Sequence, residues 1–525
     1  MLRKHVYPTS VSFNGSDSQE NFQLLPKLSN IFSSHATRGR MDLVSAIAAD
    51  TANWTQTWFN YTVMDESVRE EFENKKYLEN ATNQALKMLL NPLSNFYPSY
   101  SEANNEGVTF GTGLLKPNKD KKNKLIRYQS IAFAHVYTEE NDNGIVDTLY
   151  IPKWYTGKQM MSEYPESFED EDNSLNRWVV QKMKESPDYK FKVLISIMPN
   201  HLYKAMAPKT ETNKPYASLH ILIDEGKDIL IRESGFDTFP MYLYRWERMP
   251  GNDGVPRSPA MYALDDAQIA DEMMRNTLNS AEKMLRPPLQ GPNTSFLNRI
   301  NISAGAFNRY RQIPGQTAPK IEPIVTVGNI PISLELMQDV RNSIKRHFFG
   351  DLIEQDDKKA EMTALEAQTR EQTRLKAMAP HLMRIQTEML TDLLIDLFEF
   401  MLEVGLIDEP PESLKNEGIV PMFLGPLNIA MRSNQVGALQ RFANFATALA
   451  GIDQNLLESL DGEAMLENMR EAEGVTTKIL KDKEQVAKDR EARAQAENRA
   501  AEIDQAKVLS EVGLNSARAT SELGV

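Results

Sequence analysis

The stretch from Glu361 to Val404 contains no glycine and a single proline, Pro380. Apolar residues recur through its second half at steps of three and four, which predicts a helix with one deep apolar face. Its length would be about 65 Å at about 1.5 Å per residue. Pro380 lacks an amide hydrogen and is expected to kink the helix near Lys376. Because the first half is polar on all sides, we expect one end to pack within a large body and the other to project or to lie along a wet interface.

Two shorter helices are predicted upstream of this stretch. Ser258-Pro259 is a helix start signal, with Ser as N-cap and Pro at the first helical position, and the helix is expected to end at Arg286. A second helix is predicted over 332–349, with Gly350 ending it. Its apolar stripe consists of Leu334, Met337, Val340, Ile344 and Phe348.

The segment 287–331 between these helices is rich in Pro, Gly and Asn. It carries four basic residues against one acidic residue, Glu322. The four are Arg299, Arg309, Arg311 and Lys320. A basic segment in an acidic chain is either a solvated loop or a contact for phosphate or an acidic partner, and composition alone leaves both open.

Between Val108 and Tyr244 the pattern changes to short β-like runs separated by turn residues. His220 lies in one of these runs and is predicted to be partly buried and hydrogen-bonded rather than a metal ligand. Helices are expected again beyond Pro410-Pro411, over 434–449 and 456–469 and in the charged, Ala-rich stretch 481–516. The predicted fold class is therefore α+β, predominantly helical, with one β-rich segment.

Composition limits the possible functions. The 525 residues include 59 Lys and Arg against 73 Asp and Glu, a formal charge of −14, which disfavours a dedicated nucleic-acid-wrapping protein. The chain has no cysteine, which excludes disulfides, Cys-ligated zinc, iron–sulfur clusters and Cys nucleophiles and suits a reducing cytoplasm. Since no apolar run approaches the ~20 residues of a membrane-spanning helix, no membrane association is expected.

Catalytic motifs are absent from the sequence. There is no GxSxG, no phosphate-binding GxxxxGK[ST] and no HExxH. Asp265-Asp266 and Asp356-Asp357 are the carboxylate pairs that would have to hold Mg²⁺ in a nuclease. Adjacent helical residues project about 100° apart and seldom converge on one ion. We therefore predict no enzyme, no metal site and no cofactor.

The order of these elements resembles a known family once the local residues are added. The strongest stretch runs from Arg245-Trp246-Glu247 through Pro250-Gly251 to Arg257-Ser258-Pro259-Ala260 and Leu264-Asp265-Asp266. It resembles the signature of the head-to-tail connector (portal) proteins of short-tailed bacteriophages. Further matches are Phe110-Gly111-Thr112-Gly113 as a glycine-bearing strand turn, Arg286-Pro287-Pro288, Thr363, Glu366, Arg370, Glu371, Pro380, Arg384, Glu388 and Gly425-Pro426-Leu427.

The resemblance covers about residues 40 to 480. Asp253-Gly254-Val255-Pro256 departs from it, because relatives usually carry Tyr-Gly before Arg-Ser-Pro.

What the resemblance implies is a dodecameric portal ring at one capsid vertex, the channel for genome packaging and ejection. The implied regions are an N-terminal irregular segment 1–40, a wing 41–257 (helical, then β-rich), a first stem helix 258–286 and a clip 287–331. They continue with a second stem helix 332–349, a tunnel loop 350–360, the long kinked helix and wing return 361–430, and crown helices with a C-terminal tail 431–525. The implied partners are the major capsid protein and scaffold, the terminase packaging motor, a tail adaptor and double-stranded DNA. The implied location is the virion, after assembly in the host cytoplasm.

Under this interpretation three residue groups have roles. Candidates for contact with DNA in the channel are Lys345, Arg346, Lys358 and Lys359, which alternatively pair with acidic residues of neighbouring subunits. Candidates for docking of motor and tail are Arg299, Arg309, Arg311 and Lys320. We interpret Arg245, Trp246, Glu247, Arg257, Ser258 and Pro259 as structural.

Three other functions are weighed against the portal. One is a neck or minor capsid ring without a DNA channel. The second is a nuclease with Mg²⁺ on Asp265-Asp266 or Asp356-Asp357. The third, a coiled-coil scaffold, is disfavoured because the heptad-like pattern lapses and Pro380 interrupts it.

Overall fold

The computed structural model describes residues 1–8, 31–69, 71–168, 174–206, 214–224, 227–249, 256–293, 301–311, 322–323, 330–353, 364–415 and 417–425, and the single residues 442, 488 and 495. The chain divides into two compact units. The first comprises Met1–Thr62, Glu79–Glu409 and Gly418–Ala430, and the second Val63–Leu78, Pro410–Glu417 and Met431–Val525. The helices predicted over 434–449, 456–469 and 481–516 lie almost entirely outside the described residues.

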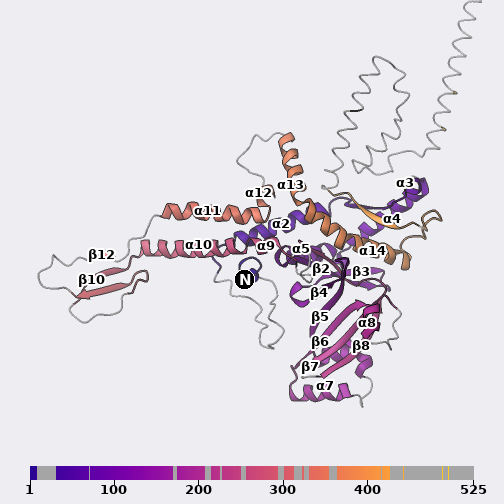
Figure 1. The fold of residues 1–525 in the computed structure, drawn as a ribbon, viewed down its shortest axis with the longest axis horizontal. Helices are drawn as coiled ribbons and strands as arrows, with labels where there is room; N and C mark the ends of the chain where they lie inside the picture. The colour runs from indigo at the N-terminus through magenta and orange to yellow at the C-terminus, as the bar shows by residue number, and fades with distance from the viewer. Residues whose placement is uncertain are drawn as a thin grey trace, which may run out of the picture. The chain divides into compact units, whose positions relative to one another are not determined.

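Helices contain more of the described residues than strands do (Figure 1). They are α1 Leu2–His5, α2 His35–Thr51, α3 Glu66–Arg69, α4 Phe72–Leu90, α5 Phe96–Phe110, α6 Gly157–Glu163, α7 Ser174–Glu185, α8 Asn200–Met206, α9 Pro259–Tyr262, α10 Leu264–Leu285, α11 Ile330–His347, α12 Gly350–Ile353, α13 Ala364–Ile385 and α14 Thr391–Glu403. Shorter turns are the 3₁₀ turns η2 Pro92–Ser94, η3 Phe133–His135 and η4 Pro165–Phe168, and the π-helical turn η5 Gln386–Leu390.

The strands form four sheets within the described part of the chain. They are β1 Phe59–Val63, β2 Thr112–Asp120, β3 Leu125–Ser130, β4 Tyr137–Glu140, β5 Val146–Thr156, β6 Lys190–Pro199, β7 Tyr216–Asp224, β8 Lys227–Phe236, β9 Tyr242–Arg245, β10 Leu289–Asn293, β11 Phe307–Arg311, β12 Glu322–Pro323 and β13 Ile419–Phe423. The predicted α+β fold class is confirmed at this level.

The largest sheet is antiparallel, in the order β4-β5-β6-β7-β8. On one face, Ile151 of β5 and Ile195 of β6 pair directly and pack against Leu114 of β2 and Leu243 of β9. Farther along the sheet, Val193 and Leu222 pack beneath α6 and α7. Val193 and Ile195 are two residues apart on β6 and so point to the same face of the sheet, where the two hydrophobic clusters lie one after the other.

Helices are more frequent in the β-rich segment than the sequence suggested. Val108 lies near the end of α5 rather than in a strand, so the predicted strand turn at Phe110–Gly113 is a helix-to-strand turn. Gly111 ends the helix with φ 95°, in the left-handed region that favours glycine. Three helices, α6, α7 and α8, interrupt the strands. Of these, α6 begins with a capping box between Thr156 and Gln159, a short-range signal that sequence reading missed.

The long helix is present in three pieces. α13 continues through Pro380, the π-helical turn η5 follows at Gln386–Leu390, and α14 completes the run to Glu403. The π-helical turn, which the apolar spacing did not predict, lies about ten residues after Lys376, and the kink expected there stays a prediction. The predicted apolar face is confirmed, because Leu382, Met389, Leu393, Leu397 and Met401 are fully buried.

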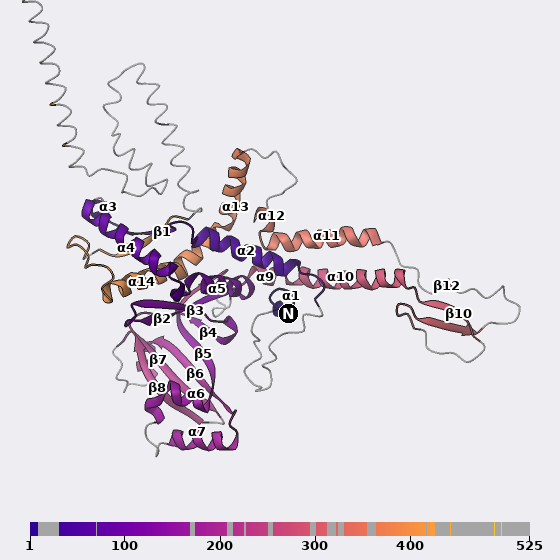
Figure 2. The same ribbon diagram turned by 180° about the vertical axis from the view of Figure 1, so that it is seen from behind.

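The two shorter helices are also present, with corrected ends. The first is broken at Ala263 into α9 and α10, and it ends at Leu285. The second, α11, ends at His347, and Gly350 begins α12 instead of terminating the helix. Phe349 adopts φ 56° between them. Both views show α10 and α11 side by side (Figures 1 and 2).

The segment between these helices contains strands that sequence reading did not predict. β10 pairs in parallel with β11 and antiparallel with β12. In Figure 1 this small sheet lies at the end of the α10–α11 pair away from α9.

Little of the second unit lies in the described residues. Within it, Asn74 is fully buried, its amide donates to the Val68 carbonyl at 2.8 Å, and the Ser413 hydroxyl donates to its Oδ1 at 3.1 Å.

Candidate functional site

Arg245 lies at the centre of a buried ionic network at the end of β9. Its guanidinium bonds both carboxylate oxygens of Glu388, with Nη2 to Oε1 at 3.0 Å and Nε to Oε2 at 3.3 Å. It also donates to Glu140 and to the Gly144 carbonyl. Because Glu388 belongs to η5, this pair joins the π-helical turn of the long helix to β9 of the sheet β3-β2-β9. A bidentate arginine–carboxylate pair fixes geometry as well as contributing energy.

Trp246, the next residue, is buried and connects three segments. Its amide donates to the carbonyl of Gly111 at 2.8 Å, and its indole stacks on His381 of α13, with ring centroids 4.3 Å apart and an interplanar angle of 11°. His381 Nδ1 lies 3.1 Å from the Trp246 carbonyl. Burial lowers the pKa of His381, so the neutral ring stacks here at neutral pH.

The rest of the signature stretch holds the start of α9. Ser258 is the N-cap: its fully buried hydroxyl accepts from the Met261 amide at 3.1 Å and donates to the Thr109 carbonyl at 2.7 Å. Pro259 begins the helix. The Arg257 amide donates to the Glu247 carbonyl at 3.0 Å. The carboxylate of Glu247 accepts from the Tyr262 hydroxyl at 2.7 Å and raises the pKa of Tyr262.

The six signature residues therefore converge on one junction between β9, the Gly111 turn, α9 and the long helix. In this junction the polar groups of Arg245, Trp246, Glu247 and Ser258 bond to other parts of the chain. The sequence placed the six residues in one stretch but did not indicate that Glu388 and His381 are their distant partners.

The α10–α11 pair is the second feature with functional potential. Asp266 of α10 accepts from the Ser343 hydroxyl at 2.6 Å and lies 3.3 Å from His347 Nε2, which sets the antiparallel register of the two helices. Asp266 therefore binds side chains of its own chain. No cluster of three His, Asp or Glu side chains suited to a metal ion occurs in the part that the structure describes. Asp356 and Asp357 lie outside that part.

The structure describes only some of the predicted channel and docking residues. Lys345 packs beside Gly350, and the exposed Arg346 lies 3.3 Å from Asp351 within its own chain. In β11, Arg309 pairs with Gly291 and Arg311 with Asn293, which places both on the small sheet. Lys358, Lys359, Arg299 and Lys320 lie outside the described residues.

Comparison with known proteins identifies the family. The family model described as "Bacteriophage head to tail connecting protein" matches residues 1–480. The chain belongs to this connector family. Two relatives are each 25% identical: the "Portal protein" of Salmonella phage epsilon15, over 485 residues (91% of this chain, 84% of the relative), and the "Probable portal protein" of Bordetella phage BPP-1, over 496 residues (91% and 85%).

Solved structures give more distant matches to the connector chain. One is titled "Neck of native GTA particle computed with C12 symmetry", with 9% identity, TM-score 0.36, and coverage of 78% of this chain and 87% of that one. Another, "Neck of empty GTA particle computed with C6 symmetry", has 8% identity, TM-score 0.34, and coverage of 78% and 86%.

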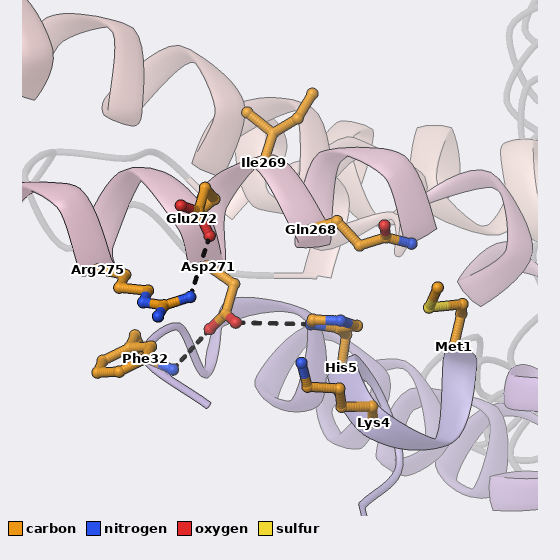
Figure 3. A pocket seen from close by; sticks show the side chains of 9 residues that line it. All are labelled: Met1, Lys4, His5, Phe32, Gln268, Ile269, Asp271, Glu272 and Arg275. Carbon is orange, nitrogen blue, oxygen red and sulfur yellow. Dashed lines mark hydrogen bonds and ion pairs between the residues drawn. The ribbon is translucent and has the colours of Figure 1, made fainter. Parts of the chain in front are cut away.

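The connector chain also has a pocket that sequence reading missed. A half-open cavity of about 550 Å³ lies between the N-terminal segment and α10 (Figure 3). Its lining residues are Met1, Lys4, His5, Phe32, Gln268, Ile269, Asp271, Glu272 and Arg275. Nothing in the local sequence of residues 1–5 predicted that they pack on a helix more than 260 residues away.

Asp271 anchors the pocket. Its Oδ1 accepts from the backbone amides of Phe32 at 2.6 Å and Ser33 at 3.0 Å, and its Oδ2 lies 3.8 Å from His5 Nδ1 (Figure 3). Burial, with the neighbouring Lys4, lowers the pKa of His5, so this histidine is neutral at neutral pH. The pocket contains no nucleophile with an adjacent base, and its form suits binding rather than chemistry. No helix among the described residues is long and apolar enough to cross a membrane.

Proposed function

We propose that this chain is the subunit of a portal, a ring of identical copies at one vertex of a phage capsid through which double-stranded DNA enters and leaves. Membership of the connector family supports this, as do relatives over nine-tenths of the chain that are named as portal proteins. We infer that the ring is a dodecamer and that, like a structural protein, it has no enzymatic activity of its own.

The α10–α11 pair carries the proposal. Ile269 and Leu278 of α10 are 48% and 51% exposed, and nine residues, or about two and a half turns, separate them. They therefore project from opposite sides of one helix. On α11, Leu334 and Leu336 are exposed as well. A helix with apolar side chains on opposite sides needs neighbours on both sides, which a head-to-tail ring supplies.

Images of the purified protein test this directly. Negative-stain electron microscopy is expected to show rings with a central bore, and native mass spectrometry counts the subunits. A chain that remains monomeric over a wide range of protein and salt concentrations would refute the proposal. Rings without a bore wide enough for duplex DNA would instead favour the alternative, a neck or minor capsid component.

The region assignments follow from this proposal. Residues 41–257 are the wing, α9–α10 and α11 are the stem helices, and the small sheet β10–β12 belongs to the clip. The tunnel loop follows α11 over 350–360, and the crown lies within 431–525. The partners are then the major capsid protein and scaffold on the capsid side, and the terminase motor and later a tail adaptor at the clip. Its location would be the virion, after assembly in the host cytoplasm.

Sparse cations in an acidic ring suit a channel through which DNA must slide. Each phosphate that a cation neutralises adds affinity, so a uniformly basic wall would retard the duplex. We assign sparse phosphate contacts to Lys345, Arg346, Lys358 and Lys359. The exposed Arg346–Asp351 pair contributes little on its own and leaves Arg346 able to exchange partners. Particles carrying Lys358→Ala with Lys359→Ala test the tunnel loop, because unchanged packaging and DNA retention would remove it from the mechanism.

The basic clip residues Arg299, Arg309, Arg311 and Lys320 are assigned to docking of the motor and the tail. Charge reversal at Arg309 and Arg311 is expected to weaken binding of both partners to preformed rings. Normal motor binding and tail attachment would refute this assignment. A Mg²⁺-dependent DNA cleavage assay on the pure protein tests the remaining alternative, a nuclease.

A further inference from the structure

The pocket of Figure 3 lies on the side of α10 that faces away from α11. Asp266 marks the side that faces α11, because it contacts Ser343 and His347. Arg275 follows Asp266 by nine residues, about two and a half turns, so it projects from the opposite side. The rim of the pocket is partly apolar, since Met1 and Phe32 have exposed side chains there, whereas Ile269 projects from another side of α10.

The charged groups at the pocket are two cations, Lys4 and Arg275, and two carboxylates, Asp271 and Glu272. Asp271 already accepts two backbone amides, and Glu272 forms an exposed pair with Arg275 at 3.8 Å. His5 is neutral because burial lowers its pKa. Lys4 has no ion pair with any other described residue. Two cations at the mouth of the pocket can therefore meet a carboxylate from outside: Lys4, and Arg275 by exchanging its exposed pair with Glu272.

The opposite charge lies on α11. Glu335 and Asp339 are exposed, one helical turn apart, and neither forms an ion pair within the described part of the chain. Glu335 precedes the buried Ile344 by nine residues, so it projects from the side of α11 away from the core of its own chain. The exposed Leu336 lies directly beside it.

The two surfaces lie at the same height along the hairpin. The Asp266–Ser343 bond fixes the register of the two antiparallel helices. Arg275 is nine residues, about 13 Å, beyond Asp266, and Glu335 is eight residues, about 12 Å, before Ser343. A rotation about an axis parallel to the hairpin preserves height, so it brings Glu335 of one copy level with Arg275 of the next.

We propose that the pocket between the N-terminal segment and α10 receives α11 of a second copy of this chain. Glu335 of that copy pairs with Arg275 and Asp339 with Lys4, while Leu336 contacts the apolar rim formed by Met1 and Phe32. This inference rests on the proposed ring and specifies one of its contacts. The N-terminal segment thereby becomes part of the subunit interface, although it lies far from α10 in the sequence.

The absence of cysteine allows a selective cross-linking test. The variant Arg275→Cys with Glu335→Cys, oxidised mildly as assembled rings, is expected to give a ladder of covalent multimers that reductant returns to monomer. Each single variant should remain monomeric on the gel. The matched control is Glu282→Cys with Glu335→Cys, which moves one thiol about 10 Å along α10 and beyond the ~7 Å Cα separation that a disulfide tolerates.

Charge reversal gives a second measurement if the cysteine variant assembles poorly. Glu335→Lys is expected to raise the ring dissociation constant at least tenfold, and adding Arg275→Glu should restore it. Rings that form normally without a 275–335 cross-link, or that tolerate Glu335→Lys, would overturn this inference and leave the portal proposal standing. Failure of the unmodified chain to form rings at all would overturn both.

Discussion

Arg374 of α13 holds Asp50 of α2 by two parallel hydrogen bonds, Nη1 to Oδ2 at 2.7 Å and Nη2 to Oδ1 at 2.9 Å, across 324 residues of sequence. The two side chains are only 10% and 4% exposed. This planar pair attaches the polar half of the long helix to a helix near the start of the chain. Sequence reading expected that half to lie in a wet environment, but at Arg374 it is anchored within the fold.

Removing one member of this pair is expected to be costly. Arg374→Ala leaves the Asp50 carboxylate buried without its main cation and should lower the free energy of unfolding by about 3–5 kcal/mol. Chemical denaturation of the purified chain measures this. The control is Arg38→Ala, because Arg38 pairs with Asp42 at 3.9 Å on the exposed side of α2, and its loss should cost under about 1 kcal/mol. Equal effects of the two substitutions would contradict the inference.

A second prediction concerns Gly107, where α5 passes the fully buried ring of Tyr244. A Cβ at this glycine would lie 2.5 Å from Tyr244 Cζ, and the Tyr244 hydroxyl is held by Asn104 Oδ1 at 3.0 Å. Gly107→Ala should therefore force the ring to move and destabilise the chain by about 1–3 kcal/mol or more. Gly418→Ala is the matched control, since nothing lies within 4 Å of its Cβ position. Thermal unfolding of both variants tests the difference.

Local patterns predicted much of this fold. The Ser258-Pro259 signal marks the start of α9, and the apolar steps mark α14. These elements were predictable because each depends on residues within a few positions of one another. His220 was predicted to be hydrogen-bonded, and its Nδ1 lies 2.8 Å from the Tyr164 hydroxyl, a partner 56 residues away that the sequence did not indicate.

Features that depend on distant residues were not predictable. The spacing of apolar residues does not indicate the π-helical turn at Glu388. Arg245, which pairs with Glu388, is 143 residues away in the sequence. The pocket likewise joins His5 to Asp271. Pro380 is tolerated within α13, which continues through it.

The Ser258 cap gives a third prediction. Ser258→Ala removes both the acceptor for the Met261 amide and the donor to the Thr109 carbonyl, and the site is fully buried. The loss should be about 1–2 kcal/mol. Ser45→Ala provides the comparison, because Ser45 only donates back to the Met41 carbonyl on an exposed helix face, and that change should be close to neutral. A Ser258→Ala chain as stable as the Ser45→Ala chain would show that the cap is not needed.

The last prediction uses the buried Glu106 of α5. Burial raises the pKa of Glu106 from 4.5 to about 7, although the Phe133 amide bonds its Oε2 at 3.2 Å and Arg40 lies near. The folded chain then keeps a proton that the unfolded chain loses, so stability falls as pH rises from about 4.5 to about 7 and levels off above that. A shift of this size corresponds to about 3 kcal/mol.

Denaturation of the unmodified chain and of Glu106→Gln at pH 5 and pH 8 isolates the contribution of Glu106, because the titrations of all other groups cancel in the difference between the two chains. The free energy of unfolding of Glu106→Gln minus that of the unmodified chain should be larger at pH 8 than at pH 5. A difference that does not change with pH would mean that Glu106 ionises normally in the folded chain.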